Sequence, residues 1–282
     1  MARLSARPVR AALQGLGSLR LGLLVSRGRS VRWAGGGAAR TRSGGARPIW
    51  WSPTPPGLDE RDQLDDQAWR QLRARGLVDV RRPRPEVEDA LGTLAHPAVE
   101  ADLRMMTGPG QEVRVLACAS GMVGLVSVVT EQAVDLVPAH PSRLAEGLLA
   151  HVPDHPAATG NAVSIPAGIC HGAGLRADTE LARLERVGLR TDDARQVRRL
   201  IAGSVVRWFT IGAAARDRAG RRHRARDVVS VLDTEHGRIQ IRHDAATPDG
   251  TRLLLAPTDR RRLSSEVTAL LRTAVDAAAL EP

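Results

Sequence analysis

The chain of 282 residues has a formal net charge of +10, and every basic residue in it is an arginine. Ten of the 41 arginines precede the first acidic residue, Asp59, and the 31 that follow are matched by 31 acidic residues. The chain from Asp59 onwards therefore lacks the overall positive field on which nonspecific nucleic-acid binding depends, and its few aromatic residues leave little stacking surface for single strands.

Residues 1–46 contain no acidic residue and are rich in Arg, Gly and Ala. This composition predicts a disordered leader, or a start codon placed too early; a transit peptide has a similar composition. Its apolar run, AALQGLGSLRLGLLV, is interrupted by Arg20 and is too short and too charged to span a bilayer. We expect one folded domain over residues 47–280.

Apolar periodicity predicts the elements of the first half. A helix around Leu72 should end at Gly76, which suits a left-handed C-cap. Pro97 should end the second helix, and Pro138 the last of four strands. The expected helices are around residues 64–75, 87–95 and 144–152, and the expected strands are 98–105, 111–118, 122–129 and 132–137.

The second half repeats this order of elements. One helix should end at Gly188, a second follows, and Pro257 should close the last of four strands before a C-terminal helix. The expected helices are 181–187, 194–201 and 263–274, and the expected strands are 205–214, 225–233, 238–243 and 251–256.

Short identities place the two halves in register. Leu72-x-x-x-Gly76-Leu77 matches Leu184-x-x-x-Gly188-Leu189, and Pro138 with Arg143-Leu144 matches Pro257 with Arg262-Leu263. Strands that follow one another through short turns favour antiparallel sheet, and their segregation from the helices favours an α+β fold. We therefore predict a pseudo-twofold duplicated unit of antiparallel sheet with packed helices and a C-terminal helix, with halves at about residues 60–155 and 175–275.

An arginine-rich stretch, RDRAGRR, lies between two of the predicted strands. Gly220 falls where a tight hairpin needs a positive φ, and acidic residues such as Asp217 and Asp227 offset part of the charge. The stretch therefore predicts a solvated hairpin tip. Contact with an acidic partner or a nucleic acid, through this hairpin and the leader, is the alternative.

Few residues have spacings typical of catalysis or metal binding. Cys170, in GICHGAG, resembles the cysteine motif of PfpI-like hydrolases, but Pro166 spoils the strand that a nucleophile elbow needs before it. His151 and His155 have helical ligand spacing, yet prolines break any helix there. Cys118 and Cys170 form no CxxC pair and indicate free thiols in a reducing cytosol, with one bridge between them as the alternative. A binding module fits better than an enzyme, with a cysteine hydrolase using Cys170 as the alternative.

Longer strings resemble a known family. WRQLRARGLVD followed by ALGTLAHPAVEADLR resembles the N-terminal half of the EspG family, and GAAARDRAGRRHRARDVVSVLDTEHGRI resembles its C-terminal hairpin. LLLAPTDRRRLSSEVTALL is similar to its closing strand and helix, and the likeness extends over about residues 47–275. In the hairpin, a strand that ends in Asp-Thr and is followed by Gly-Arg corresponds here to Asp233-Thr234 and Gly237-Arg238.

This resemblance implies a cytosolic chaperone of actinobacterial ESX (type VII) secretion. Such chaperones have an α+β fold with a pseudo-twofold repeat, and they cap the apolar helical tip of PE–PPE protein pairs without any cofactor or catalytic residue. A partner of this kind requires an exposed apolar surface. Two candidate regions are the turn that begins at Met105 and Met106, where the resemblance also implies a client-contacting loop, and the strand start near Val205 and Trp208.

Overall fold

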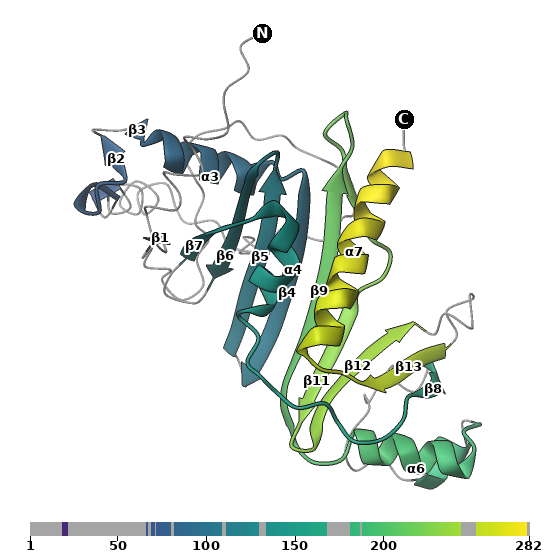
Figure 1. Ribbon diagram of the computed structural model, residues 1–282. Helices are drawn as coiled ribbons and strands as arrows, with labels where there is room; N and C mark the ends of the chain where they lie inside the picture. Colours follow the sequence, from purple (N-terminus) through teal and green to yellow (C-terminus); the bar gives the residue numbers. More distant parts are fainter. Residues whose placement is uncertain are drawn as a thin grey trace. The chain divides into compact units, whose positions relative to one another are not determined.

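The computed structural model describes residues 19–21, 66, 69–70, 72–79, 82–108, 111–129, 134–167, 181–186, 188–243 and 252–280. The chain divides into two compact bodies, and strand β4 is grouped with the second one. Figure 1 labels the helices and strands. The first body comprises residues 1–97 and 114–144, and the second comprises residues 98–113 and 145–282.

The first body contains antiparallel strands in the order β1–β7–β6–β5. Its strands are β1 (Leu19–Leu21), β5 (Gln111–Ser120, of which the first three residues belong to the second body), β6 (Val123–Val129) and β7 (Val134–Ala139), with a small separate hairpin of β2 (Val78–Asp79) and β3 (Arg82–Pro83). Helix α3 (Pro85–Ala95) packs Ala90 against Leu116 and Leu125 of this sheet. The 3-10 helix η1 (Pro141–Arg143) follows β7.

The second body contains a longer antiparallel sheet, ordered β4–β9–β11–β12–β13–β8, with the short β10 paired to β9. Its strands are β4 (Val99–Gly108), β8 (Val163–Pro166), β9 (Val205–Arg216), β10 (Arg222–Arg224), β11 (Val229–Thr234), β12 (Gly237–His243) and β13 (Arg252–Pro257).

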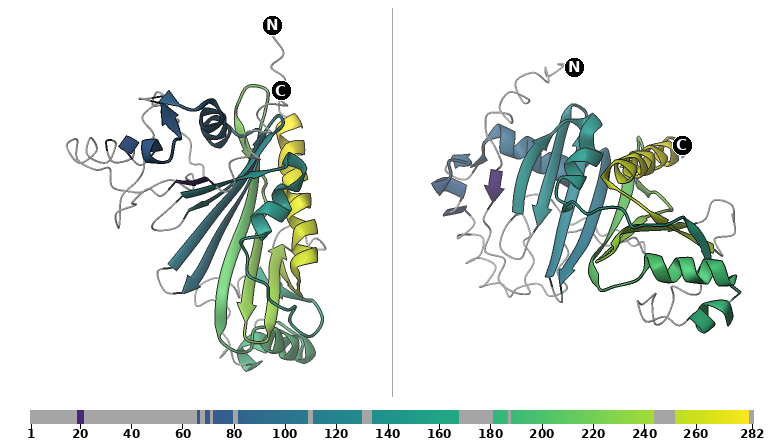
Figure 2. Two further views of the ribbon diagram at one scale, coloured as in Figure 1. Left: turned by 60° about the vertical axis from the view of Figure 1, so that its left-hand side comes forward. Right: turned by 60° about the horizontal axis from the view of Figure 1, so that its bottom comes forward.

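Helices cover the two faces of this sheet unequally. The long α7 (Arg260–Leu280) contacts β9, β10 and β4, whereas α6 (Thr191–Leu200) contacts β8 and β13 on the opposite face (Figure 2). Helix α5 (Leu181–Arg186) packs on α6, and the short α4 (Leu144–Leu149) precedes them. The α5–α6 side of the core joins Leu184, Val197 and Leu200 to Ile239 and Leu255 of the sheet.

The matching Leu-x-x-x-Gly-Leu strings adopt the same conformation. Gly76 and Gly188 have φ of 65° and 89°, and the amide of the following leucine donates to the carbonyl of the leucine five residues earlier, over 3.0 Å for Leu77 and 3.2 Å for Leu189. This is the Schellman form of helix C-cap, in which glycine takes the left-handed position. The predicted ending at Gly76 is confirmed, and the repeated identity marks a repeated cap.

The predicted order of elements and the α+β class are confirmed in the described residues. Strands β1, β2, β3 and β10 were not predicted, and β1 lies in the leader that was expected to be disordered. Two further details were wrong. The segment around Pro166 forms strand β8, which proline tolerates because β8 is the outermost strand of the sheet and Pro166 is its last residue. The predicted helix 144–152 ends at Leu149, shortly before Pro153.

Candidate functional site

The two sequence regions that we considered as partner sites lie side by side in the second body. Strands β4 and β9 pair so that Met106 is opposite Trp208, and Met105 is opposite Phe209. Opposed residues share a face of the sheet and neighbouring residues alternate, so Met106 and Trp208 lie on one face and Met105 on the other. Met105 is only 2% exposed. The expectation that it contacts a partner therefore does not hold, because the alternation turns its side chain into the core.

The other candidates form an exposed group. Val205, Val206 and Trp208 have 51%, 43% and 46% of their surface exposed, and Met106 is half-buried beside Trp208. We call Met106, Val205, Val206 and Trp208 the apolar surface. Single exposed apolar residues are ordinary, but a contiguous group of this kind is typical of a surface that binds another protein.

An irregularity in the sheet explains why two consecutive valines are both exposed. Strand β11 pairs with β9 as Asp233 with Arg207, and then, after a register shift, as Thr234 with Val205. Val206 is the additional residue, so β9 contains a bulge at this point. A bulge breaks the alternation of side chains and redirects them. With strict alternation Val206 would share the face of Trp208 and Val205 would turn to the other face, so the bulge is what leaves both valines exposed. Sequence reasoning named Val205 and missed Val206, although the spacing of two residues from Trp208 indicates it.

The apolar surface shares its face with α5 and α6 but is not covered by them. Trp208 is opposite Leu232, and Leu232 is opposite Ile239, which belongs to the core under α6. Helix α6 contacts β8 and β13, at the far side of this face. The helix pair therefore seals one part of the face, and the start of β9 with the end of β4 remains open to solvent.

Polar groups border the apolar surface. Arg104 and Glu112 form an ion pair of 2.8 Å on the β4 side. On the β11 side, the amide of Ser204 donates to the carboxylate of Glu235, and the amide of Glu235 donates to the carbonyl of Ser204, both over 3.2 Å. An apolar centre with a polar rim is the usual composition of a protein–protein interface.

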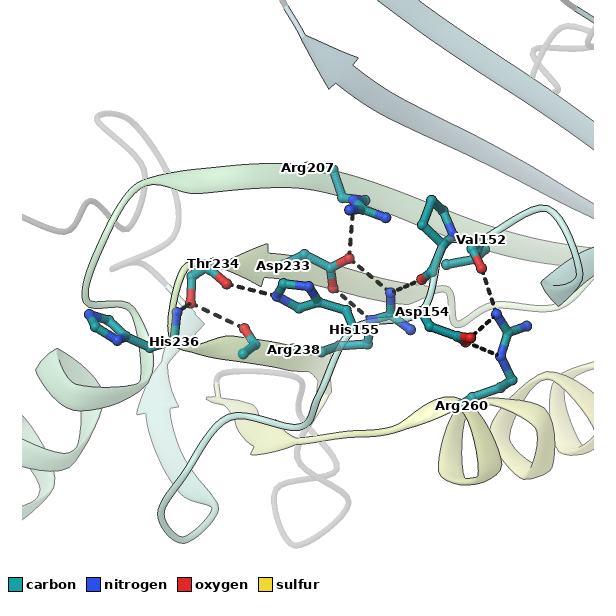
Figure 3. A network of polar contacts seen from close by, with 11 residues as sticks. Val152, Asp154, His155, Arg207, Asp233, Thr234, His236, Arg238 and Arg260 are labelled. Atoms are coloured by element: carbon teal, nitrogen blue, oxygen red, sulfur yellow. Dashed lines mark hydrogen bonds and ion pairs between the residues drawn. The ribbon is translucent and has the colours of Figure 1, made fainter.

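On the opposite face of the same strands, the Asp-Thr and Gly-Arg residues form a buried polar network (Figure 3). Arg238 donates to both carboxylate oxygens of Asp233, over 2.6 and 2.8 Å, and its side chain is 1% exposed. It also donates to the carbonyl of Pro153 and lies 5.5 Å from the centre of the Phe209 ring. Arg207 adds a second cation, 3.3 Å from Asp233. The motif therefore forms buried structural contacts and does not face the apolar surface.

This network attaches the segment after α4 to the sheet. Gly237 has a φ of 126°, and a Cβ atom there would lie 2.5 Å from the backbone of Ala158. Nearby, Arg260 at the start of α7 donates to the carbonyl of Val152 over 2.7 Å and pairs with Asp154. His155 lies 2.7 Å from the carbonyl of Thr234, where it serves the same attachment.

Several arginines of the hairpin form ion pairs with nearby carboxylates. Gly220 has a φ of 79°, which confirms the predicted turn. Arg222 pairs with Glu100 and Arg224 with Asp102, both on β4. Asp217 accepts a hydrogen bond from His223, which is the main reason that its pKa lies well below the usual range, and Arg221 adds to this effect. These contacts favour the prediction of a solvated hairpin over that of a nucleic-acid contact.

The described part of the chain offers no group of three or more His, Cys, Asp or Glu side chains that could hold a metal ion. Cys170 lies outside the described residues, and Cys118 is buried. Within the described residues, no helix has both the length and the apolar character needed to cross a membrane.

Fold and surface together define an α+β protein with an exposed apolar face of the kind that docks another protein. A family model described as the EspG family matches residues 38–269, and the chain belongs to that family. Among solved structures, the chain is similar to the Mycobacterium tuberculosis type VII secretion system chaperone EspG5, solved in complex with a PE25–PPE41 dimer. The identity is 16%, the match covers 75% of this chain and 84% of that one, and the TM-score is 0.55, which shows a shared fold. No curated protein matches the chain.

Proposed function

We propose that this protein is a cytosolic, non-enzymatic chaperone or adaptor for substrates of an ESX (type VII) secretion system. Its clients are helical proteins of the PE/PPE kind, which it keeps soluble and delivers for secretion. Membership of the EspG family and the fold shared with EspG5, whose solved complex contains a PE25–PPE41 dimer, support this assignment.

The observation that carries the proposal is the apolar surface. Met106, Val205, Val206 and Trp208 come from two strands that are about a hundred residues apart in the chain, and only their pairing brings them together. An apolar helical tip aggregates in water, and covering it with such a surface removes apolar area from solvent on both sides. Met106 and Trp208 would supply the centre of the contact, because a tryptophan and a flexible methionine adapt well to an apolar partner.

Co-expression with the helical proteins encoded in its own ESX locus, followed by co-purification, tests the function. With a client identified, Trp208→Asp and Met106→Asp should each weaken binding by about thirtyfold or more, as expected when a central contact of about 2 kcal/mol is lost. Both side chains are solvent-accessible, so the melting temperature should change little.

Met122→Asp is the matched control. Met122 is 56% exposed but lies at the turn between β5 and β6, in the first body. It should bind the client as the unmodified protein does. If Met122→Asp weakens binding as much as Trp208→Asp does, the effect arises from added charge and not from this surface. If no helical protein of the locus co-purifies with the unmodified chain, the chaperone function itself is wrong.

A further inference from the structure

The charge of Arg207 is not needed to balance the buried carboxylate beside it. Asp233 is completely buried, but Arg238 already satisfies both of its oxygens and balances its charge. Arg207 brings a second positive charge, with its side chain 14% exposed. Its Nη1 atom is buried and finds no hydrogen-bond partner among the described residues. Burying a surplus charge and an unsatisfied donor lowers stability, so stability alone does not account for an arginine at this position.

The position of Arg207 in the strand suggests what it does. Its pair with Asp233 is the last regular register step of β9 and β11, immediately before the bulge at Val206. Trp208 is its neighbour in the chain and faces the opposite side of the sheet. Figure 3 shows the ion pair of Arg207 with Asp233. This pair is attached to the short piece of backbone whose other face presents the apolar surface.

Apart from the strand pairing itself, the attachments of this piece of backbone are weaker. The two hydrogen bonds between Ser204 and Glu235 are 3.2 Å long, and the one to the Glu235 side chain is exposed to solvent. Gly203, with a φ of 79°, precedes them and permits the chain to turn. Strand ends with exposed hydrogen bonds and few buried contacts open readily. An ion pair in the interior, where solvent screens it less, is the stronger restraint.

We propose that Arg207 is a positioning residue for the apolar surface: through Asp233 it holds the bulge of β9 and so keeps Val205, Val206 and Trp208 in the arrangement that a client contacts. This inference rests on the proposed function, but the restraint on the strand can be measured without any client. A fixed surface binds more tightly because the client does not have to order it.

Arg207→Met tests the proposal in the full chain. It keeps the length of the side chain and leaves Asp233 paired with Arg238, so no buried charge loses its partner. The melting temperature should change by no more than about 3 °C. Amide hydrogen exchange of Val205, Val206 and Trp208 should become at least about tenfold faster, since local opening is now easier. Affinity for the client identified by co-purification should fall by about tenfold.

Two further variants separate positioning from a general loss of structure. Arg207→Lys retains the charge and should restore most of the protection and affinity. Arg224→Met removes a more exposed ion pair, between Arg224 on β10 and Asp102 on β4, at the other end of the β4–β9 contact, and should leave both readouts unchanged.

The proposal is overturned if Arg207→Met exchanges at the unmodified rate at Val205, Val206 and Trp208, whether or not a client is known. It is equally overturned if exchange accelerates throughout the second body, because Arg207 is then a general stabiliser. Loss of protection with unchanged client affinity would show that the bulge does not need to be held for binding, which also contradicts it.

Discussion

Two groups of arginine–carboxylate contacts in the second body use the same chemistry in different surroundings. In the buried network, Asp233 and Arg238 are 0% and 1% exposed and meet through two hydrogen bonds. At the β9–β10 hairpin, Arg221 and Arg222 pair with carboxylates while 57% and 32% of their side chains remain in solvent. The hairpin contains more arginines, but the stability of the fold depends more strongly on the buried network.

The difference follows from desolvation. A charge in the interior has lost its hydration and depends on its partner, so removing that partner is costly even where the pair itself adds little. A charge at the surface recovers water when its partner is removed, and such pairs typically contribute 0–1 kcal/mol. The number of arginines in a stretch of sequence therefore says little about where the fold is sensitive. Each prediction below compares the two groups.

Asp233→Asn should have the largest effect. It leaves Arg238 and Arg207 in the interior without a counter-charge, which costs about 3–5 kcal/mol. The melting temperature should fall by on the order of 10 °C, since each kcal/mol corresponds to about 2–4 °C in a domain of this size. Circular dichroism during heating measures this. A loss below about 1 kcal/mol would mean that water reaches the network and that it behaves like the hairpin.

Two glycine substitutions provide the next comparison, with one glycine from each group. Gly237→Ala introduces a Cβ atom 2.5 Å from the backbone of Ala158 at a φ of 126°, and backbone strain with overpacking should cost about 2–4 kcal/mol. Gly220→Ala has a similar conformational penalty, at a φ of 79°, but meets no atom within 4 Å, so it should cost about 1 kcal/mol. Chemical denaturation of both variants measures these costs. Equal losses of unfolding free energy would show that the contact with Ala158 does not restrict the side chain at residue 237.

The sequence predicted the fold better than the site. Periodicity located the strands and helices because one face of each is buried, and Gly76 and Gly220 marked a cap and a turn because only glycine adopts those conformations freely. Strand β8 was not predicted, because the tolerance of Pro166 depends on its being at the sheet edge, and edge position is a property of the whole sheet.

The apolar surface was only partly foreseen for a similar reason. Met106, Val205 and Trp208 were candidates from residue type and from family resemblance, but that Met106 lies opposite Trp208 depends on the long-range register of β4 and β9. The same register places Met105 inside. Val206 is two residues from Trp208 and alternation alone could have indicated it, whereas the exposure of Val205 on the same face depends on the bulge, which results from how β11 pairs. Register and bulges are set by tertiary contacts.

A smaller effect is expected from Arg222→Met at the hairpin. The pair with Glu100 is partly solvated, so its loss should cost no more than about 1 kcal/mol. A double-mutant cycle with Glu100→Gln should give a coupling energy that shrinks as salt is raised, because a solvated pair is screened. The same cycle for Asp233 and Arg207 should depend less on salt. A coupling at the hairpin that is large and insensitive to salt would remove the distinction between the two groups.

The smallest effect concerns the acid dependence of the hairpin. The hydrogen bond from His223, with further contributions from Arg221, holds the pKa of Asp217 below its ordinary value. A carboxyl group whose pKa is lowered by folding stabilises the native state above its unfolded pKa, about 3.9, and this stabilisation is lost as the pH falls below that value towards the folded pKa. The difference in unfolding free energy between the unmodified protein and Asp217→Asn should therefore be present at about pH 5 and shrink towards about pH 3. Denaturant titrations at the two pH values measure it. A difference that is the same at both values would show that the Asp217 carboxylate is not the group that titrates, and that the hairpin is held by its turn geometry instead.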